Sequence, residues 1–294
     1  MSLAGVKAAL IGGDARELEI LRLMKAEGME VRVIGLPTGA EAITGRPQEK
    51  TMADAVTGAR ALVLPIPGLG VDDSIYAPKW PEKLYLRPDN LKRCAASAMV
   101  VMGWASSTLA KSIGDAGMRL REYEKDDELM ILRSRAIAEG ALRIAIENTE
   151  VTLHREPVFV LGFGRVAQTL VGTLLALRAD VTLVARNPVQ LARAWEMGAE
   201  PVELKDLASR IGRAKVIMNT APARLLDEKM LALTAPDALI MDLSAPPGGV
   251  DFEAAKKLGR KAIWARGLGS RAPITVGRSQ WKGVRRILAE ELGG

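Results

Sequence analysis

The sequence predicts an α/β protein built from two Rossmann-like domains, each a doubly wound parallel sheet, that flank a cleft. Two observations predict this fold class. A strand–turn–helix unit opens twice within the 294 residues, first at Lys7–Ile11 and again at Val158–Leu161. After each opening, short apolar segments alternate with helical patterns, which is typical of parallel sheets. The length also suits two domains that each bury a core of their own.

The first part of the chain is expected to form one domain over residues 1–132. Its expected strands are Lys7–Ile11, Val31–Ile34, Ala61–Pro65, Ala98–Met102 and Arg119–Glu122. A long loop rich in glycine and proline, residues 65–73, follows the third of these strands. Since open α/β sheets bind ligands at the carboxyl ends of their strands, we expect this domain to carry the substrate or catalytic site.

The rest of the chain is expected to hold a connection and a nucleotide-binding domain. Residues 133–156 contain a helix, at about 134–148, whose period places Ile137, Ala141 and Ile144 on one face. The strands expected in the second domain, residues 157–277, are Val158–Leu161, Val181–Ala185, Val216–Asn219, Leu239–Leu243 and Ala262–Ala265. The last segment, residues 278–294, reads as a helix that could pack back onto the first domain.

The composition argues against several classes of protein. The net charge of +6 is spread among interleaved acids, and only Lys282–Arg286 is locally basic, so we do not expect nucleic-acid binding. No apolar run is long enough to span a bilayer, so no membrane role is expected. The start of the sequence lacks a secretory pattern and Cys94 is alone, and both observations favour the cytoplasm. The single His154, in a polar connection, predicts neither a metal cluster nor a Ser-His-acid set.

The second strand–turn–helix unit carries a dinucleotide fingerprint. Gly162, Gly164 and Ala167 fit the G-x-G-x-x-G/A pattern between a strand and a helix. The first glycine permits the tight turn, the second lets the backbone approach a pyrophosphate, and the small third residue allows close packing. In the first unit, Asp14 takes the place of the second glycine, where a carboxylate would block and repel phosphate. We therefore expect one cofactor site, in the second domain.

The choice of cofactor depends on the residue after the second strand of this domain. NAD enzymes usually place an acid there to bind the ribose hydroxyls, whereas this chain has Arg186, which suits a 2′-phosphate. The sequence therefore predicts NADP. A solvated arginine is the simpler alternative for Arg186, and plain turns are the simpler alternative for the later loops. The residues expected to bind the cofactor are Gly162, Phe163, Gly164, Arg165, Val166, Ala185, Arg186, Asn187, Thr220, Ala221, Pro222, Leu243, Ser244 and Gly267.

Several segments form a set that spans essentially the whole chain. They are Gly12–Arg16, Ala138–Ala141, Gly162–Arg165, Asn219–Pro222, Asp242–Ser244, Pro247–Phe252 and Ala272–Pro273. Together they resemble the family of dipicolinate synthase A subunits, sporulation proteins that make dipicolinate. The resemblance implies NADP-linked oxidation of dihydrodipicolinate, a small dicarboxylate, to pyridine-2,6-dicarboxylate, with the B subunit of dipicolinate synthase as a partner. A homo-oligomer is also allowed.

The chain departs from this family pattern at two places. Ala136-Ile137 stands where a Pro-Thr pair is usual, and Ile274 stands where a lysine is usual. If these positions touch the dicarboxylate, the substrate differs from that of the family.

The implied reaction assigns roles to residues of the first domain, because two substrate carboxylates need cationic or amide donors. Arg16 is expected to clamp a carboxylate, and Asp14 to orient Arg16 or to accept a proton. The alternative is that Asp14 only caps the helix and pairs with Arg16. Glu139 is a further catalytic candidate at the domain junction, with Ser134 and Arg135 beside it. No metal is expected.

Two other functions are compatible with the sequence. One is a two-domain NADP-dependent dehydrogenase of another small carboxylic acid, although neither Lys79 nor Lys111 has the setting of a catalytic lysine. The other is a non-catalytic cofactor-binding subunit of a complex, which the lack of an obvious proton-transfer residue favours. Hydride transfer by the protein would exclude the second.

Overall fold

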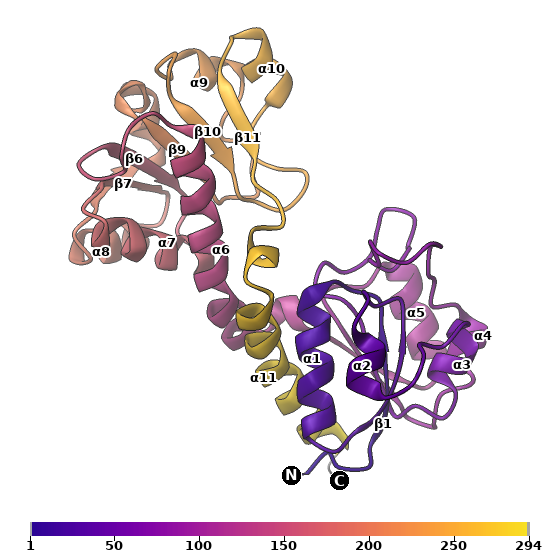
Figure 1. The fold of residues 1–294 in the computed structure, drawn as a ribbon. Coiled ribbons are helices and arrows are strands. Elements are labelled where there is room, and N and C mark those ends of the chain that lie inside the picture. Colours follow the sequence, from indigo (N-terminus) through magenta and orange to yellow (C-terminus); the bar gives the residue numbers. More distant parts are fainter. Residues whose placement is uncertain (1, 293–294) are drawn as a thin grey trace. The chain divides into compact units, whose positions relative to one another are not determined.

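The structure is a computed structural model that describes residues 2–292 (Figure 1). The chain divides into two compact units. Unit 1 comprises Met1–Arg133 together with Ala272–Gly294, and unit 2 comprises Ser134–Arg271. Unit 2 is therefore inserted between two segments of unit 1. Each unit contains one parallel sheet with helices between the strands, which confirms the predicted fold class.

The sheet of unit 1 has five strands in the order β2-β1-β3-β4-β5. They are β1 (Lys7–Ile11), β2 (Glu30–Ile34), β3 (Ala61–Val63), β4 (Met99–Met102) and β5 (Arg119–Glu122). All neighbouring strands are parallel, and the order reverses between β1 and β3. The carboxyl ends of β1 and β3 thus mark the point where ligands bind in such sheets.

Helices cover the sheet of unit 1 on both faces. They are α1 (Ala15–Ala26), α2 (Ala40–Thr44), α3 (Met52–Val56), α4 (Pro88–Leu91), α5 (Ser107–Asp115) and α11 (Pro273–Leu292). Ala9 and Ile11 of β1 share one core with apolar side chains of α3, α4 and α5. Their neighbours Ala8 and Leu10 are also buried, so the opposite face is covered too.

Helix α11 packs along α1 at very short range (Figure 1). A Cβ atom at Gly277 would lie 2.7 Å from the backbone oxygen of Arg16 and 2.7 Å from Cβ of Glu19. Only a residue without a side chain allows this approach. The pair is reinforced by an ion pair between Arg278 Nε and Glu19 Oε1 at 2.9 Å. The end of the chain thus supports the helix that carries Arg16.

The sheet of unit 2 has six strands in the order β11-β10-β9-β6-β7-β8. They are β6 (Pro157–Leu161), β7 (Asp180–Ala185), β8 (Glu200–Glu203), β9 (Val216–Asn219), β10 (Leu239–Asp242) and β11 (Lys261–Trp264). All pairs are parallel, and the order reverses between β6 and β9. This is the strand order of a dinucleotide-binding domain.

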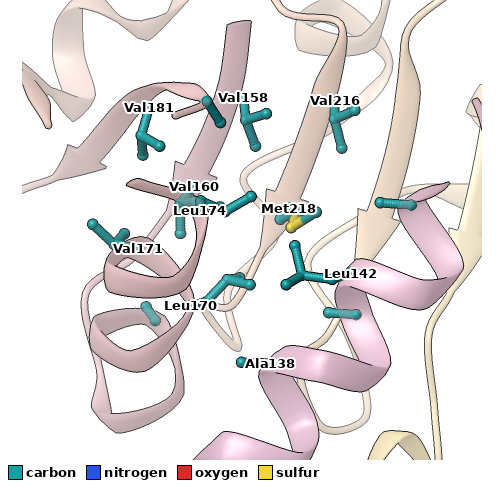
Figure 2. Packing of buried hydrophobic residues seen from close by; sticks show 14 of the residues in the cluster. Ala138, Leu142, Val158, Val160, Leu170, Val171, Leu174, Val181, Val216 and Met218 are labelled. Atoms are coloured by element: carbon teal, nitrogen blue, oxygen red, sulfur yellow. The ribbon is translucent and has the colours of Figure 1, made fainter. Parts of the chain in front are cut away.

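Two separate cores hold the helices of unit 2 against the sheet. The helices are α7 (Arg165–Ala176), α8 (Pro188–Glu196), α9 (Glu228–Ala232), α10 (Phe252–Lys257) and the second part of α6 (Asp127–Asn148). Figure 2 shows one core, in which Val158 and Val160 of β6 meet Leu170 of α7 and Leu142 of α6. Phe159 faces the other core, which α9 and α10 cover. Alternation along β6 therefore makes the sheet doubly wound.

The structure differs from the sequence prediction by more than one residue at four elements. Helix α6 begins at Asp127 rather than near 134, because Asp127 and Glu128 stabilise its first turn. Helix α11 begins at Pro273, a residue that suits the first turn of a helix. β3 ends at Val63 rather than Pro65, whose nitrogen cannot donate to a ladder. The edge strand β8 was not predicted, because its polar sequence buries only Val202.

Within residues 2–292, no helix is both long enough and apolar enough to cross a bilayer.

We predict that Gly277→Ala destabilises unit 1 by about 1–3 kcal/mol, since the added methyl overlaps backbone of α1. Gly114→Ala in α5 is the matched control, because a Cβ atom there meets nothing within 4 Å. The control should be neutral or stabilising by up to about 1 kcal/mol, because alanine is the better helix former. Thermal unfolding and amide hydrogen exchange of α1 measure the stability effects of both substitutions. Equal effects of the two substitutions would contradict the close packing of α11 on α1.

Candidate functional site

The turn after β6 is shaped by a glycine that no other residue can replace. Gly162 has φ +90°, and a Cβ atom there would lie 2.9 Å from Thr220 Oγ1. That hydroxyl is fixed, because it donates to the carbonyl of Leu161 at 2.9 Å. The turn thus brings the end of β6 against the loop after β9, at the point where the strand order reverses.

The second glycine of the fingerprint lies beside open space. A Cβ atom at Gly164 would meet no heavy atom within 4 Å. Gly164 is also the N-cap of α7, and it provides no side chain that could accept from the first-turn amides. Arg165 and Val166, which begin the helix, are half-buried. Amides at an uncapped helix start, with the positive end of the helix dipole, suit an anionic phosphate.

A cavity of about 570 Å³ adjoins this turn. Its volume lies in the range of small-molecule sites. It is lined by Gly162, Val184, Ala185, Arg186, Asn187, Pro188, Gln190, Leu204, Ala221, Ala223 and Leu225. Five of these were predicted from the sequence. The other six, Val184, Pro188, Gln190, Leu204, Ala223 and Leu225, were not predicted, because chain folding rather than a local motif brings them here.

Arg186 stands at the carboxyl end of β7 as an exposed cation. No described carboxylate forms an ion pair with it. Asn187 is used locally, since its Oδ1 accepts from Val189 N at 2.8 Å and caps α8. The guanidinium is therefore available to a phosphate at the rim of the cavity. The open turn and the uncapped helix fit a nicotinamide dinucleotide, and Arg186 adds a cation at the rim of the cavity.

The remaining cofactor candidates do not line the cavity. Phe163 is buried and its carbonyl accepts from Gln190 Nε2 at 3.5 Å, a contact that links the turn to α8. Pro222 is exposed, and Gly267 makes a turn with φ +67°. Leu243 is half-buried against the core of Figure 2. Their roles as cofactor contacts stay predictions.

Asp242 at the end of β10 organises the loops beside the cavity. Its wholly buried carboxylate accepts from Asn219 Nδ2 and from Ser244 N, both at 3.0 Å, and from Ser244 Oγ at 2.6 Å. The other oxygen accepts from the amides of Gly249 and Val250 at 2.6 and 3.1 Å. The Ser244 hydroxyl is thus used to hold its own loop. Five donors on one carboxylate fix the ends of β9 and β10 together.

The glycine turn after β1 is filled by the chain itself. A Cβ atom at Gly12 would lie 2.7 Å from both Ile75 Cγ2 and the carbonyl of Tyr76. Gly13, with φ +119°, donates its amide to the same Tyr76 carbonyl at 2.7 Å. The space that a pyrophosphate would need is therefore occupied by a loop of unit 1. This geometry gives a second reason, besides Asp14, why this turn does not hold a dinucleotide.

Asp14 and Arg16 form a bidentate ion pair at the start of α1. Arg16 Nε and Nη2 each donate to Asp14 at 2.8 Å, and Tyr76 Oη donates a longer bond at 3.4 Å. Burial acts to raise the pKa of Asp14, but the hydrogen bonds and charge of Arg16 prevail and lower it. Arg16 is 7% exposed, and its Nη1 has no hydrogen-bond partner among the described residues. Asp14 therefore holds the Arg16 side chain, and it also caps α1, since its Oδ1 accepts from Arg16 N at 3.0 Å. The role of Arg16 in carboxylate binding stays a prediction.

Glu17 is the residue of this site that sequence reasoning missed. It is wholly buried, and its two oxygens accept from Asp14 N at 2.7 Å and Ile66 N at 3.1 Å. It joins the turn after β1 to the loop after β3. Burial raises the pKa of Glu17 to about 7, against the opposing charge of Arg16. The spacing of Asp14 and Glu17 is that of a capping box, a signal that could have identified it.

The other candidates lie elsewhere in the chain. Glu139 forms an ion pair with Arg271 at the surface of unit 2, and Arg135 is exposed. Ser134 is wholly buried. His154 is exposed in the connection before β6. Among residues 2–292, no three His, Cys, Asp or Glu side chains gather as metal ligands.

Comparisons with known proteins cover almost the whole chain. Residues 7–124 match the family model described as the N-terminal domain of the dipicolinate synthase A subunit. The A subunit of dipicolinate synthase from Bacillus subtilis (strain 168) is 32% identical over 292 residues, which cover 98% of this chain and 97% of that protein. The crystal structure of the dipicolinate synthase A chain from Bacillus subtilis has a TM-score of 0.89 at 31% identity, covering 99% of this chain and 98% of that one.

A more distant solved structure shares the fold alone. The transhydrogenase from Sinorhizobium meliloti has a TM-score of 0.68 at 17% identity, covering 97% of this chain and 95% of that one.

The raised pKa of Glu17 predicts a pH-dependent stability. The contribution of Glu17 to the free energy of unfolding is fully present below its ordinary pKa of 4.5. This contribution is lost as the pH rises through about 7. Glu17→Gln cannot titrate, so the wild type should lose up to about 3 kcal/mol relative to this variant between pH 4.5 and 7.5. Urea unfolding of both proteins at each pH measures the difference. If the difference in free energy of unfolding between the wild type and Glu17→Gln does not change with pH, the raised pKa of Glu17 is contradicted.

Proposed function

Because this chain belongs to the family of dipicolinate synthase A subunits, we propose that it is an NADP-dependent oxidoreductase that converts dihydrodipicolinate to dipicolinate. The observation that carries the proposal is the open Gly164 turn beside the exposed Arg186 in a dinucleotide-type sheet. Unit 2 would hold the nucleotide and unit 1 would supply carboxylate-binding groups. Membership of the family supports the proposed reaction, and the residues of the site support the proposed cofactor.

The nucleotide would be bound by backbone and charge. The first-turn amides of α7 would hold the pyrophosphate, and Arg186 would pair with the 2′-phosphate. When bound, the nicotinamide of NADP⁺ supplies the acceptor for hydride. The pocket wall of Val184, Ala185 and Leu225 would exclude water from the adenosine half.

The substrate loses two hydrogens, one with its electron pair as hydride and one as a proton. Aromatisation of the ring favours both losses, so a strong base is not required. Arg16 would bind a ring carboxylate through its unused Nη1 donors. Asp14 is a poor proton acceptor, because Arg16 lowers its pKa, so we assign it as a positioning residue. The proton would pass to water.

The working unit would include a second protein. The Bacillus subtilis relative is named as one subunit of a synthase, which supports the B subunit of dipicolinate synthase as a partner. Glu139, paired with Arg271 at the surface of unit 2, is retained only as a weaker candidate for contact with substrate. A homo-oligomer is compatible with this proposal.

Arg186→Ala should weaken NADPH binding by about 10- to 100-fold and NADH binding little, since a charge-assisted hydrogen bond contributes about 1.5–3 kcal/mol. Lys257→Ala is the control, because Lys257 is an exposed, unpaired cation of unit 2 outside the cavity. Fluorescence titration with both nucleotides measures the affinities. Equal losses for NADPH and NADH would exclude the 2′-phosphate assignment.

Arg16→Gln should lower kcat/KM for dihydrodipicolinate by about 10- to 100-fold while NADPH affinity stays unchanged. Arg22→Gln is the control on the same helix, because Arg22 pairs with Glu19 and its side chain is 56% exposed. The assay generates the substrate in situ with its synthase and follows NADPH and dipicolinate together, with and without the B subunit. Absence of turnover by the wild type under both conditions, despite NADPH binding, would favour a different small acid or a non-catalytic role.

A further inference from the structure

A second cavity lies at the amino edge of the unit 1 sheet, opposite the edge that carries Asp14 and Arg16. Lys7 and Glu30, the first residues of β1 and β2, are register partners there. The cavity has a volume of about 340 Å³, at the lower end of the range of small-molecule sites. Basic side chains and small apolar residues line it.

The charge of this cavity is strongly unbalanced. Four cationic side chains, Lys7, Lys25, Arg32 and Arg46, line it with a single carboxylate, Glu30. None of the four forms an ion pair with a described carboxylate, whereas Arg22 and Arg285 of the same unit do. Like charges around one cavity repel each other, and a bound anion would remove this repulsion.

The two arginines are held in place by the backbone. Arg32 Nη1 donates to the carbonyl of Asp54 at 2.7 Å, and Arg46 Nη2 donates to the carbonyl of Val31 at 2.8 Å. Glu49 N also donates to Val33 O at 2.8 Å, so the segment that carries Arg46 is fixed along the open edge of β2. Each guanidinium has five N–H donors, and one of them donates to these backbone carbonyls. The donors that remain are oriented before any ligand arrives.

Small apolar residues complete the wall. Ala8, Val31, Ala55 and Ala59 are buried at the cavity, and their short side chains leave room for a ligand. Lys7, Lys25 and Arg46 are exposed, so the cations lie at the mouth of the cavity and the apolar residues lie beneath them. The site therefore combines a charged side with an apolar one, as expected for a small organic anion.

We propose that this cavity binds a small phosphorylated metabolite, whose phosphate lies among Arg32, Arg46 and the two lysines. A phosphate monoester carries about −1.5 to −2 charge near pH 7 and offers three acceptor oxygens. Its geometry matches the fork of an arginine, while lysines add point charges. The proposal concerns the amino edge of unit 1 and does not depend on the reaction proposed above.

Calorimetric titration of the full chain with glycerol 3-phosphate, inorganic phosphate and citrate tests this site. The double variant Lys25→Gln/Arg46→Gln should bind glycerol 3-phosphate at least about tenfold more weakly than the wild type, because two charge-assisted contacts are lost. The double variant Lys50→Gln/Lys79→Gln removes the same charge from exposed, unpaired lysines of unit 1 outside the cavity, and it should bind within about twofold of the wild type.

Each outcome of this titration bears on the proposal. A loss confined to the Lys25/Arg46 variant locates the phosphate at this edge rather than at the start of α7. No binding by the wild type at about 10 mM of either phosphate, or equal losses in the two double variants, would overturn the proposal. Tighter binding of citrate than of glycerol 3-phosphate would overturn the assignment of a phosphorylated ligand.

Discussion

Buried amides at the carboxyl edge of a parallel sheet must find acceptors, and this constraint shapes the candidate sites of both units. In unit 1, Glu17 accepts from the loops that follow β1 and β3. In unit 2, Asp242 accepts from the loop that follows β10 and from Asn219 at the end of β9. Each carboxylate is wholly buried. Glu17 therefore joins two loops, and Asp242 joins the loop after β10 to the end of β9. These bonds fix the backbone beside both candidate sites.

The two glycine turns, after β1 and after β6, share a local sequence pattern but have different surroundings. Gly12 is needed because Ile75 and Tyr76 of the same chain press against the turn. Gly162 is needed for its backbone angle, while Gly164 faces open space. The first turn is thus an internal packing contact and the second is an open edge. A glycine pattern alone does not distinguish these two cases; what lies above the turn does.

Much of the fold could be predicted from the sequence, because strands such as 158–161 and 216–219 are apolar runs bounded by turn residues. The polar edge strand β8 could not, since one buried Val202 makes no pattern. At the site, Arg186 and the fingerprint glycines were recognisable from their place after a strand. The Tyr76 contact was not, because a long loop brings it to Asp14. The sequence could have identified Glu17 as the capping-box partner of Asp14. It could not predict the burial of Glu17, which depends on the folded unit.

The insertion of unit 2 into unit 1 has a consequence for how the protein is made. Residues 134–271 are contiguous and contain their whole sheet, so they can fold while synthesis continues. Unit 1 must wait, because α11 is made after all of unit 2 and closes a long loop when it docks on α1. Until then, the backbone of Arg16 lacks the contact with Gly277. A ribosome-bound chain would therefore complete unit 2 before unit 1.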